Sequence, residues 1–338
     1  MIGTPFPVVE QDLGEVLAGL GPFTAVVGDP PWGTIADRLP RPERVIIAGA
    51  MDIDGLTQMA TVADGGETVV GIGGGSALDT AKFLAWRQGK SLVQVPSITS
   101  VDAGFTDAIG VRVHNKVRYI GKITPQIVVL DLPLIRSAPL RLNRAGIGDI
   151  LSCHTGLFDW KLASDAGQGH SWNQDLATLG TSLLVELEAA IDEVVAVSDD
   201  GVRFLARAYR QIGAACAFAG HSRFEEGSEH FWAYAYEAAT GKHQIHGELI
   251  ACGVVALSAI QGNDPAWAAA IVSRSGVRAH PADLKISRDE FGAALMGLAA
   301  YAQAEQLDFS IADVRPIVEA DVAGAWAVVC DLPRHSLD

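Results

Sequence analysis

Short apolar, β-branched runs alternate with amphipathic segments along the first part of the chain. The runs are FTAVVG (23–28), RVIIAGA (44–50), TVVGIG (68–73), SLVQVPS (91–97) and QIVVLD (126–131). Continuous apolar runs of this length are typical of buried parallel strands, and the segments between them have helical spacing. The alternation predicts a doubly wound, Rossmann-like α/β domain. A further stretch, GVRVHNKVRYIG, predicts a β-hairpin over residues 110–121 that turns at Asn115-Lys116.

The pattern changes after residues 137–146, where Pro139 and Gly146 interrupt it. Beyond this point long Ala- and Leu-rich stretches with helical periodicity dominate, and almost no strand pattern remains. We therefore predict two domains, an α/β dinucleotide-binding domain at 1–143 and an all-α domain at 144–338 that carries a metal and the substrate.

Composition narrows the classes of partner. Hydrophobic residues make up 49% and charged residues 19% of the 338 positions, so a folded core is expected. A formal net charge of −15 argues against nucleic acid and anionic membranes as partners. The four cysteines are scattered, and the start of the chain has neither a basic segment nor an apolar leader. We expect a soluble, cytoplasmic protein that acts on a small molecule and forms a homodimer or higher homo-oligomer.

A glycine-rich turn follows the third of the predicted strands. In VVGIGGGSALDTAKFLAW (69–86) the chain passes through Gly73, Gly74, Gly75 and Ser76 into a helix. Glycines at such a turn allow a ligand to approach the backbone, and the helix N-terminus favours a phosphate group. The spacing is neither GxGxxG nor a P-loop, so a tight turn without a ligand fits these residues equally well.

Two histidines stand three residues apart in KHQIHGELIACG (242–253). On a helix, His243 and His246 would share a face, and they could bind a metal, transfer protons or fill a structural role. These residues alone leave all three readings open.

The turn and the segment after the next strand resemble a known superfamily. GGGS followed by D-x-A-K is similar to the dehydroquinate synthase-like and iron-containing alcohol dehydrogenase superfamily, and VPSITSVDAGFTD resembles its P-T-T-x-S-x-D segment. The resemblance implies that the turn, with Asp79, holds the pyrophosphate of NAD or NADP. It also implies that Asp102 faces the substrate. The remaining cofactor contacts that it implies are Thr99, Ser100 and Lys122. Ser97 and Ile98 depart from the two threonines of the family pattern.

Three further motifs resemble those of glycerol-1-phosphate dehydrogenases within this superfamily. They are RAGIGDILSCHTGLFDWKLA (144–163), EEGSEHFWAYAYE (225–237) and HGELIACG (246–253). The resemblance implies that Asp149, His230 and His246 bind one divalent metal ion, with zinc expected first and nickel or iron as alternatives. His243 is then a proton relay, a residue behind the ligands or a plain surface residue. Glu229 and Glu248 either orient the ligands, a role favoured for Glu248, or are ordinary first-turn acids.

Two reactions compete within the superfamily. One is hydride transfer between a nicotinamide and a small polyol or ketone, which is phosphorylated in glycerol-1-phosphate dehydrogenases. The alternative is a sugar-phosphate cyclase similar to dehydroquinate synthase, whose pattern has a Lys shortly after a Glu at position 149. The segment DILSCH lacks that Lys, which favours the dehydrogenase. A phosphorylated substrate needs basic residues, but Lys122 is expected near the cofactor instead. Arg144 and Lys161 are either phosphate-binding residues or surface charges.

Overall fold

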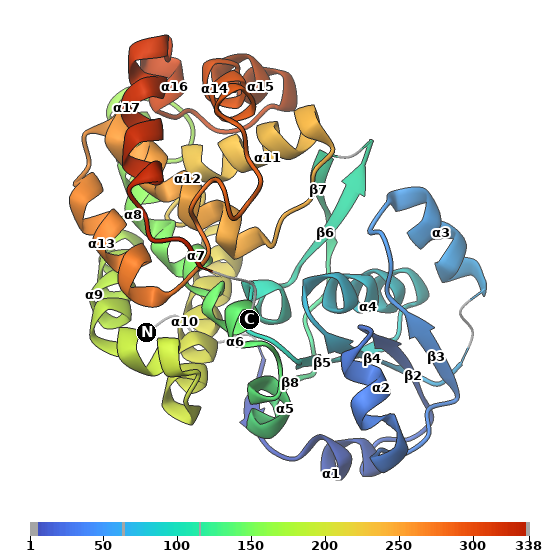
Figure 1. Cartoon of the computed structure of the whole chain (residues 1–338). Helices are drawn as coiled ribbons and strands as arrows, with labels where there is room; N and C mark the ends of the chain where they lie inside the picture. The colour runs from blue at the N-terminus through green and yellow to red at the C-terminus, as the bar shows by residue number, and fades with distance from the viewer. Residues whose placement is uncertain (1–5, 63–64, 115, 336–338) are drawn as a thin grey trace. The chain divides into compact units, whose positions relative to one another are not determined.

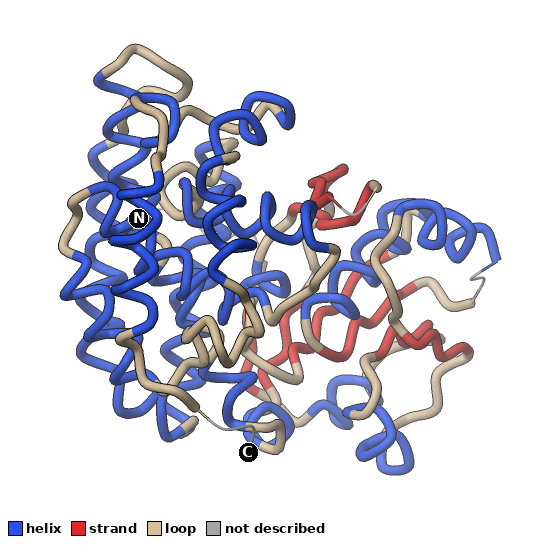
Figure 2. Tube along the Cα trace, turned by 45° about the horizontal axis from the view of Figure 1, so that its top comes forward, coloured by secondary structure: helices blue, strands red, loops and turns tan. Residues whose placement is uncertain are grey.

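The computed structural model describes residues 6–62, 65–114 and 116–335 and divides the chain into two compact units. Unit 1 comprises Met1–Asn143 and Tyr209–Phe218, and unit 2 comprises Arg144–Ala208 and Ala219–Asp338. The first break between the units falls between Asn143 and Arg144, and part of a later helix also belongs to unit 1, which the sequence pattern did not indicate. Figure 2 shows strands in the first unit and helices throughout the second. Within the described parts, no helix is both long and apolar enough to cross a membrane.

Unit 1 is built on a six-stranded parallel sheet with the order β1-β8-β5-β4-β2-β3 (Figure 1). Its strands are β1 (Val8–Glu10), β2 (Phe23–Val27), β3 (Arg44–Ile47), β4 (Thr68–Gly73), β5 (Ser91–Pro96) and β8 (Ile127–Leu130). All five predicted strands are present, and the short β1 is an addition. The prediction that every strand is buried is wrong for β3, because this strand forms an edge where Val45 and Ile47 are 43% and 51% exposed. An apolar run therefore does not distinguish an edge strand from a central one.

Alternate residues of the strands fill two apolar cores, one on each face of the sheet. Ala25 and Val27 of β2 pack into one core, while Val26 packs into the other. The helices of unit 1 are α1 (Leu13–Ala18), α2 (Pro31–Ile35), η1 (Ala36–Arg38), α3 (Ile53–Val62), α4 (Gly75–Gln88), η2 (Asp102–Phe105), α5 (Leu132–Arg136) and α6 (Leu140–Arg144). Residues of α1 and α5 pack into the first core, and residues of α3 and α4 into the second. Helices on both faces are what a parallel sheet requires, since neither face can be left in water.

The predicted hairpin is present as a separate two-stranded antiparallel sheet, β6 (Ala108–Val113) and β7 (Lys116–Lys122). Lys116 begins β7, whereas Asn115 of the predicted turn lies outside the described residues. The hairpin packs on α4, where Lys82 donates hydrogen bonds to the Ala108 carbonyl and to Thr106.

Unit 2 is helical throughout its described residues, as the sequence predicts. Its helices are α7 (Ile147–Leu151), α8 (Cys153–Asp165), α9 (Gln174–Ala196), most of α10 (Asp199–Ala219), α11 (Ser228–Thr240), α12 (His246–Gln261), α13 (Pro265–Ser275), α14 (Arg288–Met296), α15 (Leu298–Glu305), α16 (Ile311–Val314) and α17 (Glu319–Cys330). Helix α12 is apolar on all sides and packs against α7, α11, α13 and α17, so it forms the centre of the unit.

Candidate functional site

The three residues expected to bind a metal lie together in unit 2. Their ligand atoms, one each from Asp149, His230 and His246, lie within 4.8 Å of one another. Asp149 is in α7, His230 is near the start of α11, and His246 is the first residue of α12. The side chains of Asp149 and His230 are only 4% exposed, whereas that of His246 is 35% exposed. The cluster is therefore buried on one side and accessible on the other.

Two glycines bring Asp149 and His246 together. A Cβ at Gly148 would lie only 2.6 Å from the Cα and carbonyl oxygen of Gly247, so α7 can approach the start of α12 only because both positions lack side chains. This close approach places Nε2 of His246 3.3 Å from Oδ1 of Asp149. The glycines beside the two ligands in the sequence are thus part of the geometry of the site.

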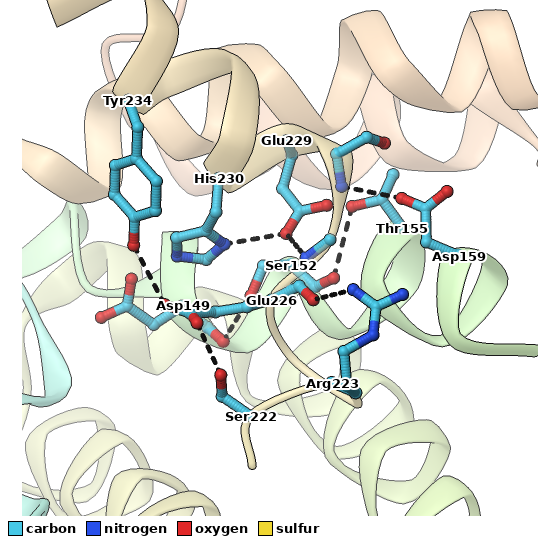
Figure 3. A network of polar contacts seen from close by, with 12 residues as sticks. Asp149, Ser152, Thr155, Asp159, Ser222, Arg223, Glu226, Glu229, His230 and Tyr234 are labelled. Carbon is cyan, nitrogen blue, oxygen red and sulfur yellow. Dashed lines mark hydrogen bonds and ion pairs between the residues drawn. The ribbon is translucent and has the colours of Figure 1, made fainter. Parts of the chain in front are cut away.

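Glu229 orients His230 (Figure 3). Its side chain is fully buried, and its Oε1 lies 2.8 Å from Nδ1 of His230 and accepts the Gly227 N–H at 2.7 Å. A carboxylate on Nδ1 makes that nitrogen the donor and leaves the lone pair of Nε2 for an ion. The other oxygen, Oε2, is buried without a hydrogen-bond partner. Of the two acids considered from the sequence, Glu229 therefore contacts a ligand, whereas Glu248 lies 3.6 Å from Arg278.

Asp159 fixes the start of the helix that carries His230. Its Oδ2 accepts the Ser228 N–H at 2.7 Å and its Oδ1 accepts the Ile311 N–H at 2.8 Å, which ties α8 to the starts of α11 and α16. Burial raises the pKa of this carboxyl to about 6, against the hydrogen bonds from Ser228, which lower it. Asp159 is the aspartate of the Asp-Trp pair in the motif at 144–163. It therefore positions the start of α11, where Glu229 and His230 lie.

A second carboxylate, that of the half-buried Glu226, lies beside the candidate ligands. Tyr234, one turn after His230 on α11, donates a hydrogen bond of 3.0 Å to Oε1 of Glu226, and the Ser222 hydroxyl donates one of 2.5 Å to Oε2 (Figure 3). The Tyr234 and His230 rings have centroids 6.0 Å apart. The sequence did not single out Glu226 or Tyr234; their position on either side of the Gly-Ser-Glu-His motif was the only signal available.

The acidic surroundings favour a positive charge at this site. Burial lowers the pKa of His230, but the hydrogen bond that its ring donates to Glu229 and the charges of Glu226, Glu229 and Asp149 together raise it to about 9. Burial and nearby acids raise the pKa of the Cys153 thiol, so this cysteine stays neutral. A carboxylate and two imidazoles that converge within an acidic, largely buried cluster fit a divalent transition-metal ion.

His243 does not lie on the same helix face as His246. Helix α11 ends at Gly241, which has a left-handed φ of 67°, and α12 begins only at His246, so His243 falls in the connection between them. Its side chain is 46% exposed, with Nδ1 3.6 Å from Glu237. The expectation of a shared helical face is therefore wrong, because the glycine ends the helical spacing before His243.

In unit 1 the glycine-rich turn lies at the switch point of the sheet. From β2 the chain continues to β3 at one edge of the sheet, whereas β4 lies on the other side of β2 and is followed by β5 and β8 toward the opposite edge. The strand order therefore reverses between β2 and β4, and the carboxyl ends of these two strands flank the crevice where α/β sheets bind ligands. A Cβ at Gly73 would lie 2.7 Å from Cβ of Ala77 and 3.1 Å from the Gly28 nitrogen. Gly74 precedes α4 with no side-chain cap on the helix, and Gly75 and Ser76 form its first turn. This end of the helix can therefore present its N–H groups to a phosphate.

Other residues expected to bind the cofactor have partners within unit 1. The Asp79 carboxylate lies 3.0 Å from Nζ of Lys82, and burial raises its pKa against the effect of that lysine. The Thr99 hydroxyl donates a hydrogen bond to the side chain of Asn143, a residue that the sequence did not indicate. Lys122 is 59% exposed and lies 3.7 Å from Asp107. Ser100 is buried and Asp102 begins η2, both just beyond the carboxyl end of β5. Their cofactor and substrate roles stay predictions.

Known proteins resemble this chain in sequence and in fold. Residues 41–139 match the family described as iron-containing alcohol dehydrogenase. The glycerol-1-phosphate dehydrogenase [NAD(P)+] of Sulfurisphaera tokodaii is 30% identical over 251 residues, which cover 72% of this chain and 71% of that protein. The enzyme of the same name from Hyperthermus butylicus is 31% identical over 222 residues, but the match spans only 62% of its length. A probable glycerol dehydrogenase from Sinorhizobium meliloti has the same fold, with a TM-score of 0.74, 22% identity and 96% coverage of both chains.

The relatives in sequence define both the class of the protein and the group within it. The chain belongs to the iron-containing alcohol dehydrogenase family. Within that family it belongs with the glycerol-1-phosphate dehydrogenases. The resemblance inferred from the motifs and the predicted fold class are both confirmed.

Proposed function

We propose that the protein is a metal-dependent dehydrogenase that transfers a hydride between NAD(P) and a small polyol or ketone. The observation that carries the proposal is the convergence of Asp149, His230 and His246 in unit 2. The glycine-rich turn at the switch point of unit 1 supports the dinucleotide part. The relatives named glycerol-1-phosphate dehydrogenase [NAD(P)+] support the reaction class.

Each residue of unit 2 has a defined task in this proposal. Three protein ligands would leave positions open at a divalent ion. A bound ion would polarise the substrate oxygen and so favour hydride departure from the same carbon. Glu229 holds the His230 ring through Nδ1, so Nε2 would be the nitrogen that binds the ion. Asp159 fixes the start of the helix that carries both residues. His243, exposed and 3.6 Å from Glu237, is suited to proton exchange with solvent, and Asp102 is expected to contact the substrate.

The finer assignments follow the chemistry of the residues. Zinc is the expected metal, with nickel or iron on the same ligands as alternatives. Either NAD or NADP is proposed as the cofactor, because the first acid after β3, which could select NAD by binding the ribose, already caps a helix. Asp52 accepts the Gly55 N–H at 2.8 Å and so caps α3. We further propose a homo-oligomeric assembly and a cytoplasmic location, to which four cysteines that form no disulfide are suited.

One assay separates this proposal from the cyclase alternative. The metal-loaded protein is incubated with NADH or NADPH and a panel of small ketones and aldehydes while absorbance at 340 nm is followed. The proposal expects consumption of the reduced cofactor in proportion to the ketone turned over. Release of inorganic phosphate from a sugar phosphate without net consumption of NAD would contradict the dehydrogenase proposal and support the cyclase reaction.

A further inference from the structure

Residues 97–102 connect the end of β5 to η2 in unit 1. They contain Thr99, Ser100 and Asp102, which are expected to contact the cofactor or the substrate. The first residue of the segment donates its N–H to the Gly73 carbonyl at 2.9 Å, which joins the segment to the glycine-rich turn. Up to η2 the segment is neither helix nor strand, so no regular ladder of backbone hydrogen bonds holds its shape. Other residues must therefore hold it.

Thr99, in the middle of this segment, is held through all three of its polar groups. Its N–H donates to Oδ1 of Asn143 at 2.8 Å, and its hydroxyl donates to the same oxygen at 3.0 Å. Its carbonyl accepts the Tyr209 hydroxyl at 2.8 Å. Thr99 and Tyr209 are 0% exposed and Asn143 is 1% exposed. The three residues therefore form a buried cluster of hydrogen bonds, which we call the Thr99 clamp.

The backbone fixes the direction of the bonds in the Thr99 clamp. A peptide N–H can only donate, so the Asn143 atom that faces Thr99 is the oxygen of the amide and not its nitrogen. The amide nitrogen donates to the Ile135 carbonyl at 2.9 Å. The Thr99 hydroxyl consequently donates its single proton to Asn143. The residue that the resemblance implied as a cofactor contact thus uses this proton inside the protein.

Asn143 and Tyr209 come from elements that are distant in the sequence. Asn143 lies in α6, and its hydrogen bond to Ile135 ties it to α5. Tyr209 lies in the part of α10 that belongs to unit 1. The Thr99 clamp therefore fixes the segment to two separate helical supports within the same unit, and neither support is adjacent to residues 97–102 in the chain.

Helix α10 approaches the same region at a second point. A Cβ at Gly213 would lie 2.0 Å from the Phe105 carbonyl oxygen, so the helix can lie this close to η2 only because this position has no side chain. Gly213 is one helical turn from Tyr209, whose ring packs on Phe105 with centroids 5.7 Å apart. The contacts at Thr99 and Phe105 thus hold the chain on both sides of Asp102.

Resting on the proposed NAD(P)-linked function, we infer that Asn143 and Tyr209 are positioning residues for the cofactor. They hold residues 97–102 in the backbone shape that binds the dinucleotide, and Thr99 acts through Asn143 instead of touching the cofactor. Loss of either bond to Thr99 leaves the parallel sheet in place but allows the segment to adopt other shapes. Dinucleotide binding then weakens, because the cost of ordering the segment is taken from the binding free energy.

A double-mutant cycle distinguishes positioning from direct contact. The Kd of NADH or NADPH, whichever the wild type binds more tightly, is measured by fluorescence titration of the metal-loaded protein. Thr99→Val keeps the branched shape of the side chain and removes the hydroxyl, so the Kd should rise about fivefold. The same substitution should have no further effect when Asn143 is already Ala. An equal effect of Thr99→Val in both backgrounds would show that its hydroxyl contacts the cofactor, and this result overturns the inference.

A single-atom change tests the second positioning residue. Tyr209→Phe keeps the ring on Phe105 and removes the hydroxyl that holds the Thr99 carbonyl, so the Kd should rise about threefold to tenfold. The matched control is Tyr236→Phe, which removes an equally buried hydroxyl in unit 2 and should leave the Kd unchanged. Titration well below the unfolding temperature makes the Kd insensitive to a loss of stability alone. An unchanged Kd in Tyr209→Phe contradicts the role of this residue.

Failure of the proposed function gives a different result. Binding of the reduced cofactor does not require turnover, so the cycle decides the inference even if no ketone is reduced. A wild type that binds neither NADH nor NADPH would contradict the proposed function and the inference together. Additive effects of the Thr99 and Asn143 substitutions, in a wild type that binds the cofactor, would contradict the inference alone.

Discussion

The glycine-rich turn of unit 1 and the metal-binding cluster of unit 2 are built in opposite ways. At the turn, Gly74 precedes α4 with no side-chain cap on the helix, and an added Cβ at Gly73 would meet the Cβ of Ala77 at 2.7 Å. In the cluster, three side chains converge from three helices, and their positions depend on buried partners such as Glu229 and Asp159. Cofactor binding at the turn should therefore be sensitive to substitutions that add side-chain atoms. Metal binding at the cluster should be sensitive to substitutions that remove side-chain atoms or charges.

The largest effect is expected from removal of a metal ligand. His246→Ala leaves Asp149 and His230 as a two-residue site, so bound metal should be lost and kcat/KM should fall about 10³-fold or more. The matched control is His280→Ala, because the His280 side chain accepts the Ala282 N–H at 3.0 Å within its own loop. Metal analysis and the 340 nm assay on both variants make the test. Full metal content in His246→Ala would remove this residue from the ligand set.

A smaller effect is expected from substitution of Glu229, which contacts the candidate ligand His230. Glu229→Gln keeps the shape of the side chain but removes the negative charge that contacts Nδ1 of His230. The metal Kd should therefore rise about 10- to 100-fold. Competition with a chromophoric chelator measures this Kd directly. Glu188→Gln, which loses a surface carboxylate 3.6 Å from Arg274, is the control. A Kd that does not change in Glu229→Gln would reduce Glu229 to a structural acid.

The turn should respond to an added methyl group. Gly73→Ala forces its Cβ against Ala77 and the Gly28 nitrogen, so NADH should bind about tenfold more weakly, while metal content should be unchanged. Gly21→Ala is the control, because a Cβ at Gly21 meets nothing within 4 Å. Fluorescence titration with NADH provides the measurement. An unchanged Kd for Gly73→Ala would mean that the dinucleotide does not approach this turn closely.

The smallest effect concerns Asp159 and pH. Its pKa of about 6 lies above the ordinary value of 3.8, so its contribution to stability is fully present below pH 3.8 and is lost as the pH rises through 6. Between pH 7.5 and pH 5 the wild type should therefore gain stability relative to Asp159→Asn, by on the order of 1 kcal/mol. Denaturant unfolding of both proteins at the two pH values gives this difference. Parallel pH dependence in both proteins would show that Asp159 does not titrate in this range.

The two sites also differ in how far the sequence predicted them. Asp149, His230 and His246 were found because each stands in a motif of fixed spacing, and the strand pattern found the sheet that ends at Gly73. Glu226, Tyr234 and Asn143 were missed because their roles come from packing between segments distant in the sequence. His243 was placed on a helix because spacing alone could not indicate that Gly241 ends α11.

Reconstitution of the metal-depleted protein tests the central claim most directly. Chelator-treated protein is titrated with Zn²⁺, and both bound metal and the rate of NADH or NADPH oxidation with dihydroxyacetone are measured at each step. The account predicts negligible activity without metal and a linear recovery that ends at one ion per chain. Full activity in protein free of divalent metal would contradict it.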